Sequence, residues 1–90
     1  MASARTVILN SLGLHARPAM AFVDAASAHG CDVRERRTDN DEWVDGKSIM
    51  QMLLLAATQG TELEIACEGD GAEGAVGALV RLVESRFDEE

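Results

Sequence analysis

A single proline, Pro18, fixes where the first helix of this chain can begin. Proline has no backbone N–H, so a helix accepts it only in its first turn. Apolar residues follow it at helical spacing, at Ala19, Phe22 or Val23, and Ala26. We therefore predict a helix from residue 16 to about residue 29, with His15 at or beside its N-cap and Gly30 as its C-terminal stop.

Hydrophobic periodicity predicts four strands and two further helices along the rest of the chain. The predicted strands cover residues 6–10, 31–38, 42–45 and 62–67, and the two helices cover residues 49–55 and 72–87. In the last strand Leu63, Ile65 and Cys67 alternate with acidic residues, whereas Glu35 and Arg37 interrupt the alternation in the second. The order is βαββαβα, and helices with one apolar stripe must cover one face of a mostly antiparallel sheet.

The length of 90 residues predicts one domain, residues 1–90. Acidic residues outnumber Lys and Arg by 16 to 8, which gives a net charge of −8. Nucleic-acid and anionic-membrane binding need clustered Lys and Arg, so this charge argues against both. The longest apolar run, residues 52–57, is too short to cross a bilayer, and the N-terminus lacks the apolar region of a signal peptide. We expect a cytoplasmic protein without membrane insertion.

Cysteine and histidine usage argues against metal or disulfide chemistry. Cys31 and Cys67 are too few for a disulfide framework, so we expect two buried or half-buried thiols in a reducing compartment. No second histidine or serine–aspartate pair lies at ligand or triad spacing from His15. We therefore expect neither a metal nor an organic cofactor.

His15 and Arg17 surround the predicted start of the first helix. The free N–H groups and the dipole of a helix N-terminus attract anions. The dipole also disfavours the imidazolium form, leaving a neutral ring nitrogen as nucleophile, and Arg17 can add a bidentate contact to phosphoryl oxygens. The structural alternative is a histidine that only caps the helix and an arginine that is only solvated.

Two segments resemble the signatures of the HPr family, the histidine-containing phosphocarriers of the bacterial phosphotransferase system. One is LGLHARPA at residues 12–19, which resembles the active-site signature, and the other is GKSIM at residues 46–50, which resembles the signature around a regulatory serine. The match follows the element order over nearly the whole chain. It implies an α+β open-faced β-sandwich, with a four-stranded antiparallel sheet covered on one face by three helices.

The resemblance also implies a function. His15 would accept a phosphoryl group on Nδ1 from phosphorylated enzyme I, which took it from phosphoenolpyruvate, and pass it to IIA domains of sugar permeases. Arg17 would contact the phosphoryl oxygens in both transfers. The protein would be a carrier and not an enzyme, and we expect it to act as a monomer.

Ser48 has two compatible interpretations. With Gln51 it forms the S-x-x-Q pattern of a capping box, which predicts the start of the second short helix. The resemblance implies that an HPr kinase/phosphorylase also phosphorylates it, so that the added charge repels enzyme I.

The docking surface implied by the resemblance is apolar and lies beside His15. Its expected members are Met20, Lys47, Ile49, Met50 and Leu53. We expect Met52 and Leu54 in the core instead. Asp24 and Ser27 stand where many relatives carry lysines, so electrostatic steering toward an acidic enzyme I should be weaker.

Three other functions compete with sugar uptake. The first keeps the phosphoryl chemistry but has a regulatory output, in a nitrogen-related or permease-less phosphotransfer chain. The second is an acylphosphatase-like hydrolase, for which Asn10 and Asn40 are poorly placed as water-orienting residues. The third is a ligand-binding regulatory domain without a covalent step.

Overall fold

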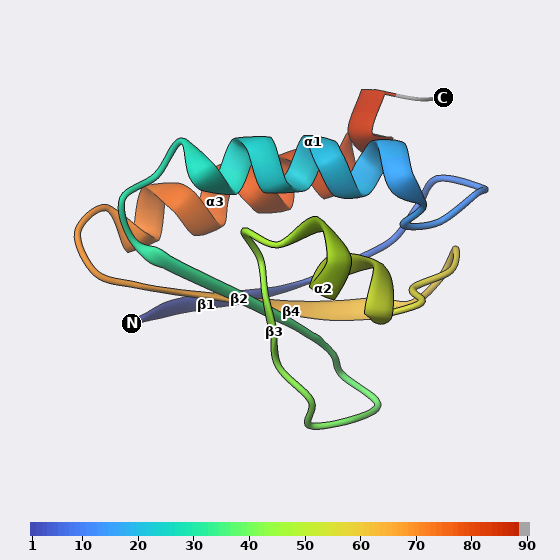
Figure 1. The fold of residues 1–90 in the computed structure, drawn as a ribbon, viewed down its shortest axis with the longest axis horizontal. Helices are drawn as coiled ribbons and strands as arrows, with labels where there is room; N and C mark the ends of the chain where they lie inside the picture. The colour runs from blue at the N-terminus through green and yellow to red at the C-terminus, as the bar shows by residue number, and fades with distance from the viewer. Residues whose placement is uncertain (89–90) are drawn as a thin grey trace.

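The computed structural model describes residues 1–88 and contains the predicted succession of elements (Figure 1). The strands are β1 (Ala2–Val7), β2 (Asp32–Arg37), β3 (Val44–Asp45) and β4 (Glu62–Glu68). The helices are α1 (Ala16–Ser27), α2 (Ile49–Leu54) and α3 (Ala72–Glu84), followed by a 3₁₀ turn, η1 (Arg86–Asp88). The sequence also predicts a frayed acidic end at residues 88–90, of which Glu89 and Glu90 lie outside the described residues.

The four strands form one antiparallel sheet in the order β1-β4-β2-β3. Figure 1 shows α1 and α3 side by side along the sheet, and α2 packs against both α1 and β3. One apolar core lies between these layers, where Phe22, Ile65 and Leu79 are fully buried. The predicted open-faced α+β sandwich is confirmed.

The first strand begins four residues earlier than the periodicity predicts, and it ends three residues earlier. β1 pairs with β4 from Ala2, opposite Cys67, to Val7, opposite Glu62. Its first residues are small or polar, so pairing with β4 and not local propensity makes them a strand. Beyond Val7 the chain leaves the ladder: the Ile8 N–H donates to the Thr61 carbonyl and the Ile8 carbonyl accepts from Gly60.

All three helices are shorter than predicted, α2 by a single residue because it ends at Leu54. α1 ends at Ser27, two residues before the expected end. α3 ends at Glu84, and Phe87 enters the core through a left-handed backbone conformation with φ of 54°. The helical spacing correctly predicted a buried Phe87, but a kink, not a continued helix, brings it inward.

The core differs from the prediction at Leu54 and Glu35. Met52 is fully buried as expected, but Leu54 is 76% exposed because the six-residue α2 buries only one residue. Glu35, which interrupts the alternation of β2, faces inward and is completely buried. Both cysteines are buried free thiols, as predicted.

Candidate functional site

His15 is the N-cap residue of α1, as Pro18 predicted. Its backbone is extended and its carbonyl accepts the Ala19 N–H at 3.0 Å, while its side chain makes no capping hydrogen bond. Pro18 is buried in the first turn, His15 is half-buried and Arg17 is exposed. The first turn of α1 contains no acidic residue. The site therefore combines an imidazole, a guanidinium and a helix N-terminus, which together suit a dianionic group.

The loop before His15 is held by close backbone contacts. Gly13 has φ of +69°, and a Cβ there would lie 2.6 Å from the carbonyl oxygen of Ala57. The next residue, Leu14, donates its N–H to that same oxygen at 2.8 Å. Glycine is required here both for its backbone angle and for the close approach.

Asn10 closes the same loop and is fully buried. Its Nδ2 donates to the Gly13 carbonyl at 2.7 Å, and the Gly13 N–H donates to the Asn10 carbonyl at 3.1 Å. Sequence reasoning assigned Asn10 to a strand and missed this role. The signal for it was a turn-forming asparagine three residues before a glycine.

Ser48 is the N-cap of α2, with half of the predicted capping box. Its Oγ accepts the Gln51 N–H at 3.3 Å. The Gln51 side chain does not return this contact, because its Oε1 accepts the N–H of Asp45 at 2.8 Å. The side chain of Gln51 thus fastens α2 to β3 instead of to Ser48.

The structure places Ser48 and His15 at opposite ends of two neighbouring antiparallel helices. Lys47 Nζ donates to the carbonyl of His29, just past the end of α1, at 2.8 Å. The other end of α2 leads to Ala57, which contacts Leu14 beside the start of α1. The start of α2 at Ser48 therefore lies near the end of α1, away from its start at His15.

Four expected docking residues are exposed on the paired helices α1 and α2. Their exposed fractions are 50% for Met20, 38% for Ile49, 79% for Met50 and 40% for Leu53. Leu54, expected in the core, adds to this apolar surface. Lys47 is half-buried and already engaged with His29, so it contributes less to the surface than the resemblance implied.

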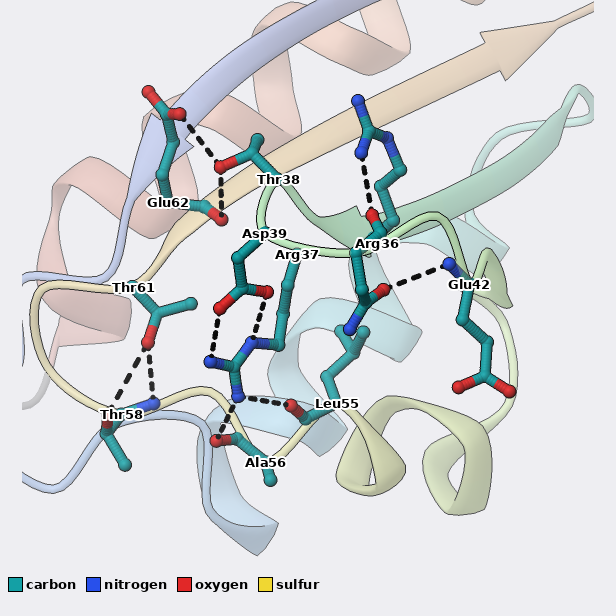
Figure 2. A network of polar contacts seen from close by, with 11 residues as sticks. Arg36, Arg37, Thr38, Asp39, Glu42, Leu55, Ala56, Thr58, Thr61 and Glu62 are labelled. Atoms are coloured by element: carbon teal, nitrogen blue, oxygen red, sulfur yellow. Dashed lines mark hydrogen bonds and ion pairs between the residues drawn. The ribbon is translucent and has the colours of Figure 1, made fainter.

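A second residue that sequence reasoning missed is Arg37 (Figure 2). Its Nη1 donates to the carbonyls of Leu55 and Ala56, each at 3.3 Å, at the end of α2. Its Nε and Nη2 donate to the two carboxylate oxygens of Asp39 at 3.1 and 2.7 Å, and this hydrogen bonding lowers the pKa of Asp39. Arg37 thereby ties the end of β2 to the segment that supports the His15 loop.

Residues 1–88 contain neither a metal-binding cluster nor a membrane-spanning helix. No group of three or more His, Cys, Asp or Glu side chains there could hold a metal ion. No helix in the same residues is long and apolar enough to cross a membrane.

Comparisons with known proteins agree with the fold and identify relatives of this chain. A family described as "PTS HPr component phosphorylation site" matches residues 2–85. A Phosphocarrier protein HPr of Pseudomonas aeruginosa is 46% identical over 89 residues, covering 99% of this chain and 98% of that protein. A Phosphocarrier protein NPr of Proteus mirabilis is 36% identical over 86 residues, covering 96% and 94%.

Solved structures give the same result. The crystal structure of HPr-C-His from Thermoanaerobacter tengcongensis superposes with a TM-score of 0.92 at 40% identity, covering 100% of this chain and 99% of that one. A phosphocarrier protein HPr from Bacillus anthracis superposes with a TM-score of 0.82 at 34% identity, covering 89% and 93%. The similarity therefore extends over the whole fold, and the range matched by the family, residues 2–85, spans residues 12–19 and 46–50.

Proposed function

This chain belongs to the HPr family and is a phosphocarrier of the phosphotransferase system, and we propose that His15 is the residue that carries the phosphoryl group. The observation that carries the proposal is the position of His15 at the N-cap of α1, with Arg17 in the first turn. A phosphohistidine there gains from the helix dipole and from the guanidinium. Because the site is open and not caged, the group can also leave again.

The transfer proceeds in two displacements. The neutral Nδ1 of His15, with the ring hydrogen on Nε2, attacks the phosphorus atom carried by enzyme I; a phosphorus–nitrogen bond forms as the bond to enzyme I breaks. In the second displacement an acceptor on a IIA domain attacks the same phosphorus and His15 leaves. Arg17 contacts the phosphoryl oxygens in both steps, and positioning plus electrostatics supply the catalysis.

The partners share one docking surface in this proposal. Met20, Ile49, Met50 and Leu53 present flexible or branched apolar side chains along the exposed sides of α1 and α2. Methionines suit a surface that serves several partners in turn. Lys47 contributes at its margin. Enzyme I, IIA domains and an HPr kinase therefore bind in mutually exclusive complexes.

Phosphorylation of Ser48 is the regulatory part of the proposal. A phosphate on Ser48 adds about −1.5 to −2 charges next to the exposed Ile49 and Met50. This charge, on a chain that already carries −8, would repel an acidic enzyme I. ATP and a cognate kinase should add one phosphate that Ser48→Ala removes; an unchanged mass under those conditions would eliminate this part alone.

A second candidate output is a phosphotransfer chain other than sugar uptake. It is favoured by the relatives named NPr, at 36% identity in Proteus mirabilis and 32% in Escherichia coli. The chemistry at His15 is the same in both cases. Phosphoryl transfer from this protein to purified IIA domains of the sugar and nitrogen-related systems, compared side by side, distinguishes the two outputs.

The proposal includes a cytoplasmic, monomeric carrier with residues 1–90 as one domain. It is a stoichiometric phosphoacceptor and not an enzyme, and it needs no cofactor of its own. Incubation with an acyl phosphate should show no catalytic turnover. The amount of acyl phosphate consumed should not exceed the amount of phosphoryl group that the protein accepts.

The deciding experiment is intact-mass spectrometry after incubation with phosphoenolpyruvate and enzyme I. We expect one added phosphate that is lost in acid, and none in His15→Ala. The matched control is His29→Ala, which removes the other histidine, past the far end of α1. Labelling that survives in His15→Ala would remove the assignment.

A further inference from the structure

We propose that Asn10 is a positioning residue for phosphoryl transfer: its buried side-chain amide holds the loop that presents His15. This inference rests on the proposed role of His15. Asn10 lies outside both sequence signatures, and its side chain is fully buried five residues before the phosphoryl acceptor. It does not face the phosphoryl group itself but closes a turn of the backbone.

The turn is closed twice by the same two residues. The Gly13 N–H donates to the Asn10 carbonyl at 3.1 Å, which is the usual hydrogen bond of a four-residue turn. In addition, Asn10 Nδ2 donates to the Gly13 carbonyl at 2.7 Å. Without the side chain, that buried carbonyl would lose its partner, which destabilises the turn.

The turn is clamped on both sides. Before it, the Ile8 carbonyl accepts from the Gly60 N–H at 2.8 Å, and the Leu9 carbonyl accepts from Gln59 Nε2 at 3.0 Å. After it, the Leu14 N–H donates to the Ala57 carbonyl at 2.8 Å. The amide of Asn10 therefore joins two fixed points, and the backbone that enters His15 has little freedom between them.

This rigidity matters because His15 must be aligned with two different partners. Its ring must lie in line with the phosphorus carried by enzyme I in the first transfer and with the acceptor on a IIA domain in the second. Displacement at phosphorus depends on positioning, and a misplacement of about 1 Å can lower a rate by about a hundredfold. The exposed docking residues lie on α1 and α2, away from this turn. Loosening the turn should therefore slow the transfer step without weakening the binding of enzyme I.

The test measures phosphorylation of purified variants by enzyme I, with the carrier as the varied substrate. Asn10→Asp keeps the shape but places a carboxylate against the Gly13 carbonyl; Asn10→Ala removes the donor without adding charge. For both we expect kcat at pH 8 to fall by at least about tenfold and KM to stay within about twofold. The NMR signals of the His15 ring should broaden or shift in both variants.

Protonation of the introduced carboxylate should restore the transfer rate of Asn10→Asp. A neutral carboxyl group can donate its O–H to the Gly13 carbonyl, as the amide does. The ratio of its kcat to the wild-type value should therefore rise toward one as the pH falls from about 8 to about 5.5. Asn10→Ala, whose side chain carries no proton, should show no such rise.

Two controls separate positioning from stability. Asn40→Asp alters an asparagine that organises another turn, in which its Oδ1 accepts the Glu42 N–H at 2.9 Å far along the chain. Ala78→Gly destabilises α3 without touching the loop. Both should retain wild-type kcat and unshifted His15 signals.

The outcomes are distinguishable from failure of the proposed function. If wild-type protein accepts no phosphate on His15, the proposed function itself fails. If wild type is labelled and folded Asn10→Asp or Asn10→Ala matches its kcat at pH 8, Asn10 is not a positioning residue. An increase in KM alone would overturn the inference too. Should Asn10→Asp unfold at pH 8, Asn10→Ala decides.

Discussion

Glu35 of β2 lies directly opposite Ile65 of β4, and both side chains are fully buried beneath the helices. On its other side, Glu35 pairs with Val44 of β3. Neither carboxylate oxygen of Glu35 has a hydrogen-bond partner in the part of the chain that the structure describes. Desolvation by burial raises the pKa of Glu35 from 4.5 to about 8. At neutral pH the core therefore holds a largely protonated carboxyl group.

We predict that the free energy of unfolding falls as the pH rises from about 4.5 to about 8. In that window the folded protein keeps the proton of Glu35, whereas the unfolded chain has released it, so folding takes up a proton. The contribution is fully present below the lower value and lost above the upper one. A shift of this size corresponds to a loss on the order of 3–5 kcal/mol. Urea denaturation across this pH range measures it.

The variant Glu35→Gln isolates this contribution from the other acidic residues. It should exceed wild type in stability at pH 8 and approach it near pH 5, because the amide does not titrate. Glu42→Gln, an exposed residue of the loop between β2 and β3, is the matched control and should follow the wild-type curve. An equally steep pH dependence in Glu35→Gln would contradict the prediction.

The elements that the sequence predicts well are those specified by nearby residues. Pro18 and the apolar spacing behind it place the start of α1 correctly, and alternation places β4 within one residue. The limits of β1 depend on its pairing with β4, more than fifty residues away, which no local pattern reveals. The alternation of β2, in which Val33 faces inward, also places the Glu35 side chain on the inward side. A carboxyl group is rarely buried, however, so the residue type argued against that position.

The residues of the candidate site also differ in how well the sequence predicts them. Motifs in the sequence indicate His15, Arg17 and Ser48 as candidates, because the roles proposed for them depend on neighbours within one helical turn. Arg37 is not, because its contacts are with backbone carbonyls of Leu55 and Ala56, and a carbonyl leaves no signature in the sequence. The sequence therefore indicates the groups proposed to react more readily than the groups that support them.

Gly13→Ala should destabilise the protein and slow the labelling of His15. At φ of +69° an alanine is strained by about 1–2 kcal/mol, and its Cβ would lie 2.6 Å from the Ala57 oxygen and 2.8 Å from the Thr58 Cα. Because both are backbone atoms, the loop must move. We expect a loss of at least about 2 kcal/mol in urea denaturation.

The control for this variant is Gly30→Ala, where a Cβ meets nothing within 4 Å. Its stability should match or slightly exceed that of wild type, and its labelling should be unchanged. If the two alanine variants behaved alike, the close approach of Gly13 to Ala57 would not be a feature of the protein in solution.

Arg37→Lys should loosen the end of α2 although the charge is retained. A lysine cannot reach Asp39 with two donors and the Leu55 and Ala56 carbonyls with a third. We expect a lower urea midpoint and faster hydrogen exchange of the Leu14 amide, whose acceptor is the adjoining Ala57 carbonyl.

Arg5→Lys is the control for this substitution, because Arg5 is an exposed residue of β1 with one long contact, 3.9 Å, to Glu62. It should leave the Leu14 amide unaffected. Equal exchange in wild type and Arg37→Lys would show that Arg37 does not support the loop.

The thiol of Cys67 should resist alkylation in the folded protein. Burial raises the pKa of Cys67 to about 11, and the neighbouring Cys31 contributes in the same direction. At pH 8 only about one thiol in a thousand would then be the reactive thiolate, and the side chain is fully covered by the core. Mass spectrometry after treatment with iodoacetamide should show modification in urea and almost none without it, in wild type and in Cys31→Ser alike. Rapid modification of Cys67 under native conditions would mean that the sheet opens beside it far more readily than this packing allows.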